Sequence, residues 1–240
     1  MSVPTHTPTA PEPTDATALG LQLALVRPVL RTAAARVWRD DDGLTGRYRH
    51  YLRAMHQVIR ASVPLLERAA DRCGERTGDP VAAPLAAYLR AHAEEERGHD
   101  DWLLSDAEAA GWPPGELTGS TPPPAVAALV GAQHYWIEYA HPVALLGYVT
   151  VLEGNAPAPG LAGLLARRTG LPPAAFETVR LHADLDGGHS ADLARLLGTL
   201  PLDAAQRSLV AVSALHTVTA LAELFDRIAE APTVQETPHE

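Results

Sequence analysis

The chain has 240 residues, of which 46% are apolar and 5% aromatic, and its formal net charge is −10. This length suits one large domain, and an apolar share dominated by Ala and Leu favours packed helices over a β-sandwich. The negative charge argues against binding to nucleic acid or to an anionic membrane surface. All 19 basic residues are Arg, which excludes chemistry that needs a lysine amine, and the single Cys73 excludes an intramolecular disulfide and a zinc–thiolate cage.

The apolar periodicity predicts a single all-α domain over residues 18–230, between a disordered tail at 1–17 and a flexible tail at 231–240. No stretch alternates with period two for long enough to predict a sheet. Brief loops favour antiparallel packing of neighbouring helices around one core. Pro28 is expected to interrupt the first helix, and Pro142 to break or kink the fourth. The helices are expected at 19–38, 44–72, 81–110, 125–153, 160–168, 174–197 and 203–229.

The N-terminal segment lacks the features of a secretory signal, because it has neither a positively charged start nor an apolar run. No apolar run approaches the ~20 residues of a membrane span. We therefore expect a soluble, cytoplasmic protein that binds neither nucleic acid nor membrane.

The pattern His-x3-Asp/Glu-x2-His occurs three times along the chain. On a helix, positions i, i+4 and i+7 fall on one side, within roughly 60° of each other. Imidazole and carboxylate are together the ligand set of iron, manganese and zinc. The three sets are His92/Glu96/His99, His134/Glu138/His141 and His182/Asp186/His189.

Each set also has a plainer interpretation. For His182/Asp186/His189 it is a solvated polar face, on a helix that Gly187 and Gly188 weaken. Within the first set, Glu96-x2-His99 has the i, i+3 spacing of di-iron helical bundles. The neighbouring Glu95 also flanks His99, and the spacing does not choose between the two carboxylates.

The set His134/Glu138/His141 is followed directly by Pro142, so pocket lining or hydrogen bonding to metal ligands is a better interpretation for it than ligation. Glu153 ends the apolar run Leu145–Leu152. A buried carboxylate is costly unless it is paired or bound to metal, whereas an exposed helix end carries no such cost. The spacing leaves these two interpretations of Glu153 open.

Three segments together resemble the heme-oxygenase-like di-iron oxidase and oxygenase family. They are residues 94–102, residues 141–154, and the His182/Asp186/His189 set. The resemblance runs from about Tyr48 to the last helix. It implies a heme-oxygenase-like, all-α bundle of about seven helices that holds two Fe ions between helices.

The resemblance also implies which residues bind the two Fe ions. Glu153 would bridge them. An extra carboxylate from an early helix joins the site in some members of the family, and Glu67 is the acid near that position, left unassigned. The implied metal ligands are Glu95 or Glu96, His99, Glu153, His182, Asp186 and His189.

The activity implied is that of a non-heme di-iron oxidase or oxygenase, with O2 as co-substrate. Its substrate would be a small organic molecule, such as an amino acid, an amine or a fatty acid, that undergoes N-oxygenation, desaturation or oxidative C–C cleavage. An external electron donor and a homodimer are left open. The side chains expected to line the substrate pocket are His56, Tyr135, Trp136, His141 and Tyr148.

Other classes share the same overall fold. One alternative is a metal-binding or scaffold protein without turnover, and another is a cofactor-free oxidase or hydrolase of the thiaminase-like superfamily. Heme oxygenase uses one axial His, for which His56 could stand. Thiaminase-type proteins rely on a cysteine nucleophile, and Cys73, beside Gly74 at a helix end, matches that role poorly.

Overall fold

The computed structural model describes residues 15–231, apart from the side chains of residues 15, 16, 186 and 187. The tails expected at 1–17 and 231–240 therefore lie mostly outside the described residues, although the first helix already begins at Asp15. The described residues form helices and no strand. In chain order they are α1 Asp15–Trp38, α2 Leu44–Ile59, α3 Ser62–Gly74, α4 Ala82–Glu95, α5 His99–Ala109, α6 Gly115–Thr118, α7 Pro124–Tyr139, the 3-10 helix η1 Pro142–Ala144, α8 Leu145–Glu153, α9 Leu161–Thr169, the 3-10 helix η2 Pro173–Phe176, α10 Glu177–Thr199 and α11 Ala204–Ala229.

The all-α prediction is confirmed, but the described residues contain more helices than the expected seven, because three long segments are broken and the short helix α6 was not expected. The segment 44–72 divides at Arg60, because the ring of Pro64 clashes with the carbonyl four residues earlier. The segment 81–110 divides at Gly98, which has a φ of 85° that favours glycine. The segment 125–153 divides before Pro142.

Pro28, in contrast, does not interrupt α1, which is continuous from Asp15 to Trp38. The prediction of a break was wrong. Pro28 and Ala24 both lie on the exposed side of α1, where water can satisfy the carbonyl that the proline leaves without a donor.

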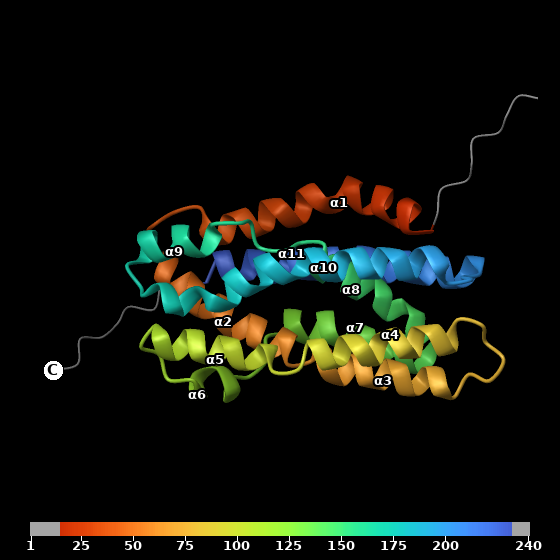
Figure 1. Ribbon diagram of the computed structural model, residues 1–240. Helices are drawn as coiled ribbons and strands as arrows, with labels where there is room; N and C mark the ends of the chain where they lie inside the picture. Colours follow the sequence, from red (N-terminus) through yellow and green to blue (C-terminus); the bar gives the residue numbers. More distant parts are fainter. Residues whose placement is uncertain (1–14, 232–240) are drawn as a thin grey trace, which may run out of the picture.

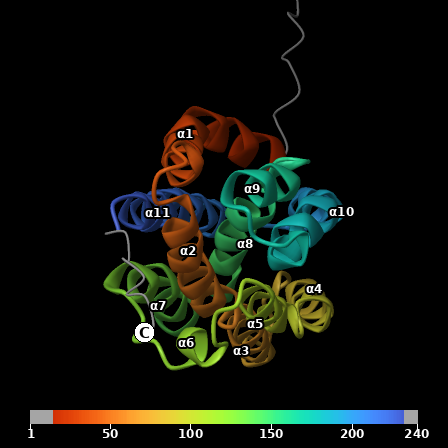
Figure 2. The same ribbon diagram turned by 90° about the vertical axis from the view of Figure 1, so that its left-hand side faces the viewer.

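The helices run along one elongated bundle (Figures 1 and 2). α1 packs along α11, and α11 packs in turn on α8 and α7. On the opposite side of the bundle α3 packs against α4. α2 lies in the middle of the bundle in Figure 2 and contacts α5 on one side and α11 on the other. In Figure 1, α5 and α4 follow one another along the bundle, so their junction falls near the middle of its length.

A glycine allows the central contact of the bundle. A methyl group on Gly147 of α8 would lie 2.2 Å from the carbonyl oxygen of Val210 and 2.7 Å from the backbone nitrogen of Ala214. Only glycine therefore allows α8 to lie directly on the backbone of α11. This contact fixes the position of α8, which ends at Glu153.

By length and composition, α11 is long and apolar enough to cross a membrane. This differs from the expectation that no apolar run approaches the length of a membrane span. Half of the most apolar window of α11 is buried inside the bundle. A core helix of a helical bundle passes the same test, and the packing of α11 on α1, α7 and α8 fits that interpretation.

Candidate metal centre

The centre forms where the junction of α4 and α5 faces the end of α8 and the middle of α10. Because Gly98 turns the backbone, α4 ends at Glu95 and α5 begins at His99. The amide of His99 donates to the carbonyl of Glu96 at 3.2 Å, which closes this turn. The i, i+7 spacing predicted that His92 and His99 share one helix face. This prediction was wrong, because the two residues lie on different helices.

The first group of donors joins His92 of α4, His189 of α10 and Glu153. The ring centroids of His92 and His189 lie 5.2 Å apart, and the two rings are almost perpendicular, at 89°. The Glu153 carboxylate lies between them, 3.5 Å from His92 Nε2 and 3.1 Å from His189 Nδ1. Glu153 is 10% exposed, so the interpretation of a solvated helix end does not hold.

The second group joins His99 of α5 and His182 of α10. Their ring centroids lie 5.6 Å apart, and Trp102 stacks on His99 at 3.9 Å. His182 Nδ1 lies 2.9 Å from the carbonyl oxygen of Thr178 and donates to it. This hydrogen bond fixes the tautomer and leaves His182 Nε2 as the ligand atom.

Glu96 lies between the two groups. Its carboxylate is 10% exposed and lies 3.4 Å from His99 Nδ1. It also offers an oxygen within 4.8 Å of ligand atoms of both His92 and His189. On this geometry Glu96 faces both imidazole pairs, whereas the close contacts of Glu153 are with His92 and His189; a bridging role for Glu153 stays a prediction.

The electrostatics of the cluster follow from burial and from the pairing of unlike groups. Burial by itself raises the pKa of Glu96, but the imidazoles of His99, His92 and His182 outweigh it and hold that pKa below the usual value. Burial by itself lowers the pKa of His92, but Glu153 and Glu96 outweigh it and raise that pKa. For His182 burial dominates, and its pKa is lowered. The lowered pKa keeps Glu96 charged beside imidazoles, and the lowered pKa of His182 favours the neutral imidazole that binds metal.

Glu95 approaches the same cluster from outside. Its side chain is 55% exposed, yet Oε2 lies 3.4 Å from His92 Nδ1 and 3.7 Å from His189 Nε2. The sequence could not choose between Glu95 and Glu96. The structure brings both to the cluster, Glu96 from the interior and Glu95 from the surface.

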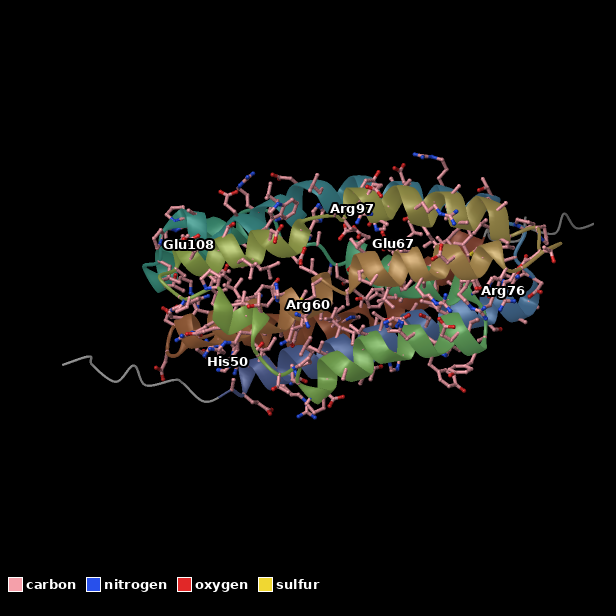
Figure 3. All side chains as sticks on the ribbon, turned by 90° about the horizontal axis from the view of Figure 1, so that it is seen from below. His50, Arg60, Glu67, Arg76, Arg97 and Glu108 are labelled. Carbon is pink, nitrogen blue, oxygen red and sulfur yellow. The ribbon has the colours of Figure 1, made fainter. Side chains whose placement is uncertain are left out.

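Two further acids named in the sequence analysis remain, Asp186 and Glu67. The side chain of Asp186 lies outside the described residues, so its role as a ligand stays a prediction. Glu67 of α3 pairs with Arg97 of the α4–α5 linker at 2.9 Å on the outer surface, where Figure 3 shows the two labelled residues close together. Half of the Glu67 side chain is exposed, so it does not join the cluster.

The set His134/Glu138/His141 also lies elsewhere, because α7 carries it to another face of the bundle. Glu138 forms an ion pair with Arg68, and His141 Nε2 lies 2.7 Å from Asp79 Oδ2. The set was expected to line the pocket or to hydrogen-bond to metal ligands, but it does not line the cavity beside the cluster, and Glu138 and His141 pair with Arg68 and Asp79 instead.

An apolar cavity of about 130 Å³ adjoins the cluster. Of the expected pocket residues, Tyr148 lines it, whereas His56, Tyr135, Trp136 and His141 are not among its lining residues. Tyr135 is 62% exposed, and Trp136 packs edge-on against His216. His56 is buried on α2, where burial lowers its pKa.

The residue that the sequence analysis left out of the ligand set is His92. His92 has the expected spacing to Glu96 and His99. The resemblance to the family, however, rests on the Glu-x2-His pattern, which does not include His92. The i, i+4 pair of His92 and Glu96 was the signal that could have included it.

The donor set fits iron. It consists of imidazoles and buried carboxylates, with no thiolate among the described residues of the cluster. His92, Glu96 and His189 alone offer three ligand atoms within 4.8 Å of one another. These observations define an all-helical protein with a histidine- and carboxylate-rich centre that can hold metal between its helices.

The comparisons with known proteins agree with this class. The chain belongs to the family described as iron-containing redox enzymes, which matches residues 49–222. The resemblance inferred from the sequence is thereby confirmed at the level of the family. A comparison with curated proteins gives no match.

Two solved structures share the fold. A domain of unknown function with a heme oxygenase-like fold from Shewanella denitrificans OS217 is 17% identical, with a TM-score of 0.64, over 89% of this chain and 88% of that chain. A TenA homolog from Pseudomonas syringae pv. tomato DC3000 is 14% identical, with a TM-score of 0.68, over 95% of this chain and all of that chain. At these identities the likeness establishes the fold alone.

Proposed function

We propose that this protein is a non-heme di-iron oxidase or oxygenase that uses O2 to oxidise a small organic substrate. The observation that carries the proposal is the convergence of two imidazole pairs around one buried carboxylate, Glu96, beside an apolar cavity. Two ferrous ions bound there would supply the electrons that reduce O2. The reaction class would be N-oxygenation, desaturation or oxidative C–C cleavage.

Each donor group has a distinct part in this proposal. His92, His189 and Glu153 would hold one ion, and His99 and His182 the other, with Glu96 facing both. The hydrogen bond from His182 to Thr178 keeps the imidazole oriented before metal arrives, which lowers the cost of ordering the site. The apolar cavity wall excludes water from the reacting part of the substrate.

The experiment is anaerobic loading with ferrous iron, followed by metal analysis of the desalted protein. We expect two ions per chain in the native protein and about one in both His182→Ala and His189→Ala, because each removes one imidazole from one pair. His134→Ala, on the exposed face of α7, is the matched control and should load as the native protein does. Native protein that takes up fewer than two ions, or a His182→Ala variant that still takes up two, would overturn the assignment.

Reaction with O2 is then measured separately. Mixing the loaded protein with O2 in a stopped-flow instrument should give a transient visible absorption together with O2 consumption. Two-ion loading without any O2 consumption would instead favour the metal-binding protein without turnover.

The cofactor-free hydrolase has less support. Cys73 is buried in the apolar core between α3 and its neighbours, and it does not line the cavity. Burial raises the pKa of its thiol to about 11, so the thiolate that a nucleophile needs is disfavoured.

A further inference from the structure

The walls of the cavity beside the cluster contain almost no charge. Their apolar side chains come from α2, α3, α8, α10 and α11, and they include Met55, Val58, Leu65, Val149, Val179 and Leu221. Among the described residues, the only acidic or basic side chains that line the cavity are His92, Glu96, Glu153 and His182. All four belong to the cluster, so no cation or anion is left over to pair with a charge on a ligand.

The uncharged polar groups of the wall are few. Tyr148 and Ser62 are neighbours and both line the cavity, and the negative charge of Glu96 acts on the Tyr148 hydroxyl. Asn155 donates its side-chain amide to the carbonyl of Val151 at 2.6 Å. Tyr51 and Thr178 are the other uncharged polar side chains of the wall. The hydroxyls of Tyr148 and Ser62 can therefore hydrogen-bond to a ligand head near Glu96.

The size of the cavity limits the ligand as well. An apolar protein cavity of roughly 150 Å³ is known to hold benzene, and this cavity measures about 130 Å³. It therefore has room for an apolar body of about six carbon atoms.

From the wall and the volume together, we infer that the substrate is a small molecule with an uncharged apolar body of about six carbons and one polar head, the head directed at the cluster. This inference rests on the proposed function and selects among its substrates. A zwitterionic amino acid or a diamine would place an ammonium group against the apolar wall without a partner, which disfavours its binding.

The probes for the test are hexanoate and 6-aminohexanoate, which share the same chain and differ by one ammonium group at the far end. Both are titrated by calorimetry into the ferrous-loaded protein under anaerobic conditions. We expect hexanoate to bind and 6-aminohexanoate to bind at least about tenfold more weakly, since about 1.4 kcal/mol corresponds to tenfold. Equal affinities, or no binding of hexanoate, would overturn the inference.

A charge placed in the wall supplies the second arm. Met55→Glu puts a carboxylate on the half-buried α2 side of the cavity, and it should reverse the preference in favour of 6-aminohexanoate. Leu164→Glu, on the exposed side of α9 and away from the cavity, is the matched control and should leave the preference as in the native protein. An unchanged preference in a folded Met55→Glu variant would contradict this placement of the ligand.

The two proposals fail in distinguishable ways, because iron content is measured on the same samples. Two bound ions with O2 consumption but no discrimination between the probes would overturn the substrate class and leave the di-iron function standing. Discrimination in a protein that takes up no iron would support the cavity inference and overturn the function.

Discussion

Asp106 provides the sharpest test of how the bundle holds α10, the helix that carries His182 and His189. This carboxylate of α5 is fully buried, and it accepts backbone N–H groups of Glu177 and Thr178 at 3.0 and 3.1 Å. It therefore caps the N-terminus of α10 from a different helix. The Tyr48 hydroxyl lies 3.3 Å away. In turn, the Thr178 carbonyl accepts from His182, so Asp106 connects α5 to a proposed ligand.

The magnitude follows from the pKa of Asp106. Burial raises it to about 6, although the hydrogen bonds from Thr178 and Glu177 act in the opposite direction. In the unfolded chain the value is about 3.9. Between these values the native protein retains a proton that the unfolded chain has released. Stability from this group is therefore present below about pH 4, and about 3 kcal/mol of it is lost as the pH rises to 6 and above.

The variant Asp106→Asn removes the charge and keeps one oxygen to accept from the N-terminus of α10. We expect the stability of the native protein relative to this variant to fall by up to about 3 kcal/mol as the pH rises from about 4 to 7. The assay is urea unfolding followed by far-UV circular dichroism across that range. Asp184→Asn, on the exposed side of α10, is the control for removing a carboxylate.

The outcome can refute the reasoning in two ways. Parallel curves for the native protein and Asp106→Asn would mean that burial does not shift this carboxyl. A difference that grows in favour of the native protein as the pH rises would mean that the hydrogen bonds to α10 outweigh burial.

Two further predictions concern packing and reactivity. Gly147→Ala should lower the free energy of unfolding by roughly 1–3 kcal/mol through overpacking against α11. In contrast, Gly131→Ala on α7, where a methyl group meets nothing within 4 Å, should be neutral or stabilising; equal urea midpoints for the two variants would contradict the close approach. Cys73, with its thiol pKa raised by burial to about 11, should resist a chromogenic disulfide reagent at neutral pH in the native protein and react in urea. Rapid reaction without urea would show that the α3 core opens readily.

The sequence was informative where the chemistry is local. The apolar periodicity predicted the all-α fold and several helices closely, including α9 and α11. The His182 and His189 spacing placed both imidazoles on α10, because seven residues of one continuous helix separate them.

Tertiary contacts decided the rest. The His134/Glu138/His141 set has the same spacing as the other two, but away from the cluster Arg68 pairs with its acid and Asp79 with its last imidazole. Glu153 could not be resolved from spacing, since its burial depends on the contact of α8 with α11. The breaks at Arg60 and Gly98 were hidden within strong apolar patterns, where one proline or one positive φ outweighs the periodicity.

The turn at Gly98 also bears on how such sites are recognised across distant relatives. An uninterrupted helix would separate the α-carbons of His92 and His99 by about 10.5 Å along a single axis. Here the axes of α4 and α5 meet at the turn. The distance between the two imidazole pairs therefore depends on the number of residues that link these helices. Consider a homologue that keeps every donor but has one residue inserted between Glu96 and His99. In that protein either α5 shifts along its axis or the contact between these two side chains is lost. Counting donors is therefore a poorer guide to iron binding than counting the residues between them.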